Sequence, residues 1–151
     1  METADRTDWA THAQRELQRA GHRAGGARAE VLGLLAHQDC CLSAQDIYDR
    51  LRTDGKSVGL ASVYRALDGL DELGLVQRVD LGDGVARFEP ALVGGDHHHH
   101  LVCDDCGKVE PFEDPSLETA IARVASGRGY AVAAHDVVLR GACEDCRHER
   151  G

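Results

Sequence analysis

Hydrophobic residues recur at helical spacing through the first half of the chain. This spacing predicts helices over residues 9–20, 27–37, 43–53 and 61–74. The apolar positions of the last helix follow one another at intervals of four and three residues: Val63, Leu67, Leu70 and Leu73. Because residues at these intervals share one side of a helix, we expect this stripe to be its buried face.

After the last of these helices, the pattern changes to strand-like alternation on both sides of a glycine-rich turn. Residues 75–81 and 85–89 flank Gly82-Asp83-Gly84, which predicts a β-hairpin. Two helices followed by a hairpin are typical of a winged helix-turn-helix, whose second helix enters the DNA major groove. The pattern therefore predicts a DNA-binding domain over residues 1–89.

The second half of the chain predicts a smaller unit behind a hinge at residues 90–95. Its expected elements are strands at 97–103, 108–112 and 131–139 and a helix at 115–126. The unit spans residues 96–151 and ends in a cysteine pair. The fold class expected is α+β, with an N-terminal winged helix-turn-helix domain and a small C-terminal α/β dimerisation domain.

The charge of the chain limits how it can bind nucleic acid. The 151 residues include 17 Lys and Arg against 26 Asp and Glu, a formal net charge of −9. This acidity argues against indiscriminate nucleic-acid binding, so DNA contacts are expected from individual arginines. Residues 1–14 are polar, unlike a signal peptide, and no apolar run approaches the roughly 18 residues of a membrane span. We expect a cytoplasmic protein with no membrane partner.

Four of the six cysteines form two C-x-x-C pairs, Cys103 with Cys106 and Cys143 with Cys146. Four thiolates are the ligand set of a closed, tetrahedral structural zinc site. A thioredoxin-like dithiol, an iron–sulfur cluster and a disulfide pair are the alternatives. One pair at each end of a unit suits a structural clamp better than catalysis, so zinc is favoured.

Four consecutive histidines precede the first cysteine pair. In a strand, alternation places His97 and His99 on one face and His98 and His100 on the other. One short segment can therefore supply ligands to two different metal sites.

Three segments resemble the ferric uptake regulator superfamily of bacterial metalloregulators, within a similarity that runs from His22 to Cys146. They are SAQDIY at 43–48, GLASVYR at 59–65 and HHHHLVCDDCGK at 97–108. The chain is most similar to the zinc uptake regulator branch. The resemblance implies a homodimer that represses metal-uptake genes by binding palindromic double-stranded DNA operators when its regulatory site is filled.

The resemblance also implies the roles of individual residues. The structural zinc site would consist of Cys103, Cys106, Cys143 and Cys146. The regulatory site, between the two halves, would consist of Cys41, Glu89, His98 and His100. An additional site would consist of His97, His99, Glu118 and His135. The DNA-binding residues would be Ser62, Tyr64 and Arg65, with packing at the edge of the helix core as the alternative for Tyr64.

The identity of the sensed metal is predicted from Cys41, where iron-sensing relatives often carry histidine. A thiolate favours softer metals, so Zn²⁺ is expected ahead of Fe²⁺ or Mn²⁺ at the regulatory site. An iron- or manganese-sensing regulator remains the alternative. Cys40 competes with Cys41 as the ligand, and the tandem cysteines could instead be redox-active.

Two other classes of protein fit less well. A zinc hydrolase with Glu118 as general base needs an open metal position, whereas each expected site offers four ligands. A metal-storage protein would need neither the helix around Tyr64 nor the hairpin. We therefore expect no enzymatic activity and no small organic substrate.

Overall fold

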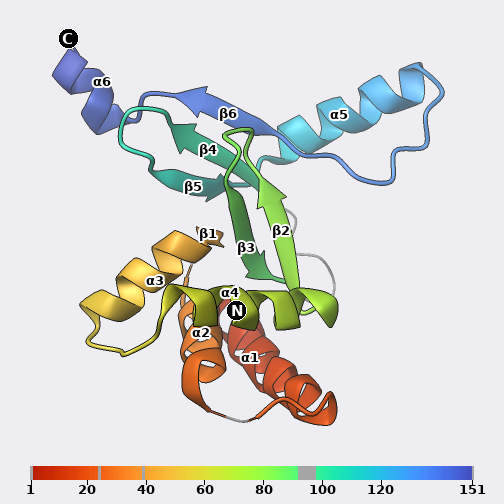
Figure 1. The fold of residues 1–151 in the computed structure, drawn as a ribbon. Helices are drawn as coiled ribbons and strands as arrows, with labels where there is room; N and C mark the ends of the chain where they lie inside the picture. The colour runs from red at the N-terminus through yellow and green to blue at the C-terminus, as the bar shows by residue number, and fades with distance from the viewer. Residues whose placement is uncertain (1, 24, 39, 92–97, 151) are drawn as a thin grey trace. The chain divides into compact units, whose positions relative to one another are not determined.

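The structure, a computed structural model, describes residues 2–23, 25–38, 40–91 and 98–150. The chain divides into two units, Met1–Asp96 and His97–Gly151. Figure 1 shows the helices of the first unit gathered beside its strands, and a separate sheet with two helices in the second. No helix in the described part of the chain is long and apolar enough to cross a membrane.

The first unit combines four helices with a small sheet. Its elements are α1 (Glu2–Arg19), α2 (Gly26–Ala36), β1 (Leu42–Ser43), α3 (Ala44–Thr53), α4 (Leu60–Glu72), β2 (Val76–Asp80) and β3 (Ala86–Pro90). The predicted helices are present, although α1 begins at Glu2 rather than at residue 9. The two-residue strand β1 was not predicted, because so short a segment carries no periodicity.

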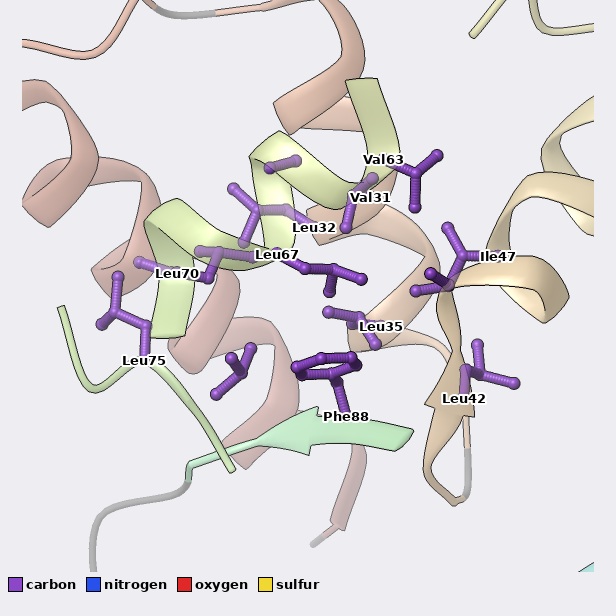
Figure 2. Packing of buried hydrophobic residues seen from close by; sticks show 14 of the residues in the cluster. Val31, Leu32, Leu35, Leu42, Ile47, Val63, Leu67, Leu70, Leu75 and Phe88 are labelled. Carbon is purple, nitrogen blue, oxygen red and sulfur yellow. The ribbon is translucent and has the colours of Figure 1, made fainter. Parts of the chain in front are cut away.

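Aliphatic side chains from α2, α3 and α4 form the centre of the first unit's core (Figure 2). Leu35, Ile47 and Leu67 are fully buried there, and Phe88 of β3 packs against the same cluster. The indole Nε1–H of Trp9 donates a hydrogen bond of 2.7 Å to the carbonyl of Leu75, which ties α1 to the start of the hairpin. This core fixes the helices that carry the candidate DNA-binding residues.

Local sequence signals set the ends of α3 and α4. Ser43 is the N-cap of α3: its hydroxyl accepts a bond from the Asp46 N–H, and the Asp46 carboxylate accepts one from the Ser43 N–H. In α4, Val63, Leu67 and Leu70 are buried as expected. The prediction for Leu73 was wrong, because the helix ends at Glu72 and the Leu73 side chain is 37% exposed.

The sheet of the first unit has the order β1-β3-β2, and all its pairs are antiparallel. β2 and β3 form the predicted hairpin, with Val76 opposite Pro90 and Asp80 opposite Ala86. β3 runs through Pro90, the first residue of the predicted hinge. The Ala91 N–H donates to the Leu75 carbonyl, and residues 92–95 of that hinge lie outside the described residues.

The second unit is a three-stranded sheet with two helices. Its elements are β4 (His99–Cys103), β5 (Val109–Phe112), α5 (Pro115–Gly127), β6 (Val138–Gly141) and α6 (Glu144–Arg150). The order is β5-β4-β6, with β5 antiparallel and β6 parallel to the central strand. The strand predicted at 131–139 was wrong for most of its length, because pairing with β4 begins only at Val138.

Candidate metal centres

The pairing of β4 with β6 brings the two C-x-x-C pairs together, and each pair with its turn is called a knuckle below. Cys103, the last residue of β4, lies opposite Gly141 at the end of β6. One ligand atom from each cysteine of the two pairs lies within 4.8 Å of the other three. The Sγ atoms of Cys106 and Cys143 are 3.8 Å apart, and the cysteines, all of which lie in the described residues, are not joined in disulfides. This cluster has the composition and the size of a tetrahedral zinc site.

Backbone N–H groups of the two knuckles stabilise the thiolate form of Cys103. Its Sγ accepts hydrogen bonds from the N–H groups of Cys106, at 3.5 Å, and Cys143, at 3.3 Å. These bonds lower the pKa of Cys103 to about 6. Gly107 closes the first knuckle with a φ of 80°, a conformation that suits glycine, and its N–H donates to the Cys103 carbonyl.

The thiol of Cys146 shows the opposite effect. Its pKa is raised, first by its hydrogen bond with Cys143 and then by burial and the remaining sulfurs. Crowded thiols resist the loss of a second proton, because thiolates repel one another. A cation among the four sulfurs would remove that repulsion, which is the behaviour expected of a metal site.

A second cluster lies at the other end of β4. Glu118 of α5 bridges two histidines, with one carboxylate oxygen 2.5 Å from His99 Nε2 and the other 2.7 Å from His135 Nε2. The Val137 N–H donates to His99 Nδ1 over 3.2 Å, so His99 Nε2 carries the ring proton. A metal on Nε2 would move this proton to Nδ1 and replace the Val137 contact. His97, predicted to share this site, lies outside the described residues.

In the first unit, the sheet register brings Cys41 to Glu89. Leu42 is opposite Phe88, so the preceding residue, Cys41, comes opposite Glu89. Both side chains are buried, with 5% of each exposed. The pKa of the Cys41 thiol is raised by its hydrogen bond with Cys40, then by burial and by the nearby Glu89 charge. The Glu89 carboxylate is therefore close enough for its charge to act on the buried Cys41 thiol.

In the second unit, His98 and His100 lie together. Their ring centroids are 4.9 Å apart, whereas the His99 ring lies 5.2 Å from that of His135. The Nε2 atom of His100 is buried without a hydrogen-bond partner among the described residues. A buried imidazole nitrogen without a hydrogen bond lowers the stability of the fold unless a ligand such as a metal ion binds it.

The proposed DNA-binding residues lie near the N-terminal end of α4, off its buried stripe. Tyr64 is 51% exposed, so the structure does not support packing in the helix core as its role. Arg65 is also exposed, and its Nη2 donates to the hydroxyl of Ser62 over 3.0 Å. The three side chains are therefore available on a helix that the core holds in place.

Sequence reasoning missed a charged pair in the hairpin turn and a backbone donor. Arg87 contacts Asp83 at 2.8 Å, and its hydrogen bond is the main reason that the pKa of Asp83 is lowered to about 2. The i, i+4 spacing of opposite charges could have identified this pair. The hydrogen bond from the Val137 N–H to His99 could not be predicted from a sequence pattern, because the two residues are 38 positions apart.

Comparison with known proteins agrees with this arrangement. The sequence profile described as the ferric uptake regulator family matches residues 19–140. The ferric uptake regulation protein of Bordetella parapertussis is 38% identical over 138 residues, covering 91% of this chain and 98% of that protein.

Two solved structures are also similar. The Helicobacter pylori ferric uptake regulator, described as having three functional metal binding sites, has a TM-score of 0.77 and 25% identity, covering 94% of this chain and 93% of that one. A zinc uptake regulator in complex with zinc and DNA has a TM-score of 0.54 and 27% identity, covering 96% and 97%.

These similarities confirm the predicted α+β fold class, and they identify a regulator rather than an enzyme. The profile covers most of both units, and the curated relative matches over nearly its full length. This chain belongs to the ferric uptake regulator family of metal-dependent transcription regulators.

Proposed function

We propose that this chain is a cytoplasmic, zinc-responsive repressor that binds palindromic operators of metal-uptake genes as a homodimer. The observation that carries the choice of zinc is the buried thiol of Cys41 opposite Glu89. Thiolate ligands favour Zn²⁺ over the harder Mn²⁺ and Fe²⁺ ions. The similar zinc uptake regulator in complex with zinc and DNA supports the same assignment.

The regulatory ligands come from both units. Cys41 and Glu89 belong to the first, and His98 and His100 belong to the second. A metal held by all four would restrict the hinge predicted at residues 90–95 and favour one arrangement of the two DNA-binding domains in the dimer. Metal and operator would then strengthen each other's binding by the same factor, because linkage is reciprocal. The unpartnered Nε2 of His100 supports its role as a ligand.

Two further sites would support the second unit. Structural zinc would bind the four thiolates of the knuckles, where it would supply the charge that keeps the sulfurs together. The additional site would use Glu118 with His99 and His135, and His97 is the fourth ligand proposed for it. The H. pylori relative is described as having three functional metal sites, the same number proposed here.

Operator recognition would use Ser62, Tyr64 and Arg65 on α4. Arginine and tyrosine side chains can reach base edges and phosphates when the helix enters the major groove. Dimer formation is supported by exposed apolar side chains in the second unit, which include Leu101, Val124, Tyr130, Val132 and Leu139. Apolar side chains that remain exposed in this way often belong to a protein interface.

The test is operator binding at buffered free concentrations of each metal. An operator is first selected from a random double-stranded DNA library on the zinc-loaded protein, and binding is then followed by fluorescence anisotropy. Zn²⁺ should switch binding at a lower free concentration than Fe²⁺ or Mn²⁺. The double variant His98→Ala/His100→Ala should lose the response, whereas His148→Ala, at an exposed position in α6, should keep it.

An iron- or manganese-responsive regulator is the second candidate. It is favoured by the name of the B. parapertussis relative and by the carboxylate of Glu89, which suits harder ions. Switching by Fe²⁺ or Mn²⁺ at free concentrations below those required for Zn²⁺ would establish this second candidate. If none of the metals changed the affinity for the operator, both candidate functions would be ruled out.

A further inference from the structure

The tandem cysteines before β1 form a dithiol. The Sγ atoms of Cys40 and Cys41 are 3.7 Å apart. Adjacent side chains of a regular strand point to opposite faces, which would separate the two sulfurs. Here the backbone bends at Cys40 and the strand begins only at Leu42, so both thiols reach the same side.

The sulfur separation matches chelation of one ion. A tetrahedral zinc ion with Zn–S bonds of about 2.3 Å holds two sulfurs roughly 3.8 Å apart. The knuckle sulfurs of Cys106 and Cys143 provide a comparison within the same molecule, and they are 3.8 Å apart. The separation between Cys40 and Cys41 therefore fits shared ligation without movement of the backbone.

The surroundings also suit a cation. Glu89 lies opposite Cys41, and its charge acts on the Cys41 thiol. Arg87 is the nearby positive group of the same sheet, but it is already paired with Asp83. A divalent ion at the two sulfurs would place a positive charge near the Glu89 carboxylate, whose charge acts on the Cys41 thiol.

We propose that both Cys40 and Cys41 ligate the regulatory metal, so that the first unit contributes a dithiolate chelate. This inference rests on the proposed function and refines its ligand set for zinc. Two thiolates and the imidazoles of His98 and His100 fill the four positions of tetrahedral Zn²⁺, and Glu89 lies beside the ion as a compensating charge. Binding releases the two thiol protons to solvent. The chelate selects Zn²⁺, and its spectroscopic substitutes Co²⁺ and Cd²⁺, against Mn²⁺.

The test uses Co²⁺ as the probe in the full-length protein, with zinc in the four-cysteine site and the thiols fully reduced. Thiolate-to-Co²⁺ charge transfer absorbs in the near ultraviolet, and its intensity grows with the number of Co–S bonds. Cys40→Ser and Cys41→Ser should each lose about half of the intensity per bound Co²⁺, and the double variant should lose all of it. His148→Ala, at an exposed position in α6 outside every proposed site, is the control and should keep the full intensity.

Affinity provides a second measurement. Cys40→Ser should weaken Zn²⁺ binding at this site by more than about 100-fold, the upper end of what loss of an outer-shell partner costs. Its effect on Mn²⁺ binding should be much smaller. Unchanged charge-transfer intensity in Cys40→Ser, with full loss in Cys41→Ser, would overturn the proposal and leave a single thiolate.

The two proposals can fail separately. If the wild-type protein binds its operator equally with and without zinc, the repressor mechanism fails, whatever the cobalt spectrum shows. If the operator response is zinc-dependent but Cys40→Ser has the wild-type spectrum, only the dithiolate fails. Far-ultraviolet circular dichroism checks that the serine variants are folded. Cys40→Ser is expected to fold because Cys40 is partly exposed.

Discussion

Removal of the four-cysteine zinc should unfold the second unit and leave the first unit intact. The buried side chains described in the second unit are few, namely His99, His100, Val102 and Cys103, and α5 buries none. Complete burial of a valine-sized side chain contributes about 1.5–3 kcal/mol. Ordering the backbone costs about 1–2 kcal/mol per residue, so apolar burial of this extent cannot hold the unit together.

The metal supplies much of the missing free energy. Structural zinc contributes roughly 10–16 kcal/mol to the folding of small zinc-dependent domains near neutral pH. Loss of one thiolate in Cys143→Ser should remove most of this contribution. The described part of the first unit has a core of its own, which includes Leu35, Ile47 and Leu67, and the two cysteine pairs lie in the other unit. The stability of the first unit should therefore change little.

Hydrogen exchange measured by peptide mass spectrometry resolves the two units. In Cys143→Ser, and in the wild-type protein treated with a strong zinc chelator, the amides of β4 and β6 should exchange at the rate of an unfolded chain. Amides of α4 should stay as slow as in the wild type. His148→Ala, which alters an exposed side chain in α6, is the control. If the amides of β4 and β6 exchanged within about tenfold of their wild-type rates, a difference of about 1.4 kcal/mol, zinc would not be what holds the second unit together.

Three other substitutions test separate parts of the structure. Arg65→Ala should weaken operator binding by about 1–3 kcal/mol in anisotropy titrations. The midpoint of thermal unfolding should not change, because the Arg65 side chain is exposed, and a lower midpoint would indicate a structural role. Trp9→Phe should lower the free energy of urea unfolding by about 0.5–1.5 kcal/mol, because the Leu75 carbonyl loses the indole donor and keeps only the Ala91 N–H; no change would mean that the indole hydrogen bond does not contribute to stability. Asp83→Asn should cost about 1 kcal/mol at neutral pH, less than the full pKa shift implies because the pair is partly solvated. The pKa of Asp83 is lowered to about 2 from 3.8, so the difference in unfolding free energy between wild type and variant should be complete above about pH 4 and vanish as the pH falls through 2. A difference that persisted below pH 2 would contradict the ion pair as its cause.

The elements that the sequence predicted correctly are those whose signals are local. Val63, Leu67 and Leu70 repeat at helical intervals, and Ser43 with Asp46 forms a capping box within four residues. The two cysteine pairs are recognisable by the same kind of short spacing. In each case the residues that interact are neighbours along the chain, so a pattern in the sequence contains the contact.

The elements that were missed depend on contacts between distant residues. β1 exists because Leu42 pairs with Phe88, and β6 begins at Val138 because its partner there is His100. Residues 131–137 were predicted to belong to this strand but lie outside it, although the Val137 carbonyl accepts a hydrogen bond from the His100 N–H. The Cys40 sulfur reaches that of Cys41 through a bend that no spacing rule predicts.

Strand β4 connects the metal sites of the second unit, and this connection has a consequence for sensing. Within five residues it carries His99 toward Glu118, His100 on the opposite face and Cys103 in the knuckle. β4 is the central strand and is paired on both sides, so its residues are ordered together. A metal bound at Cys103 would therefore fix the position of the histidines before any regulatory metal binds. Loss of the structural zinc should abolish sensing even when every regulatory ligand is present, since an unfolded β4 would leave His100 without a defined position.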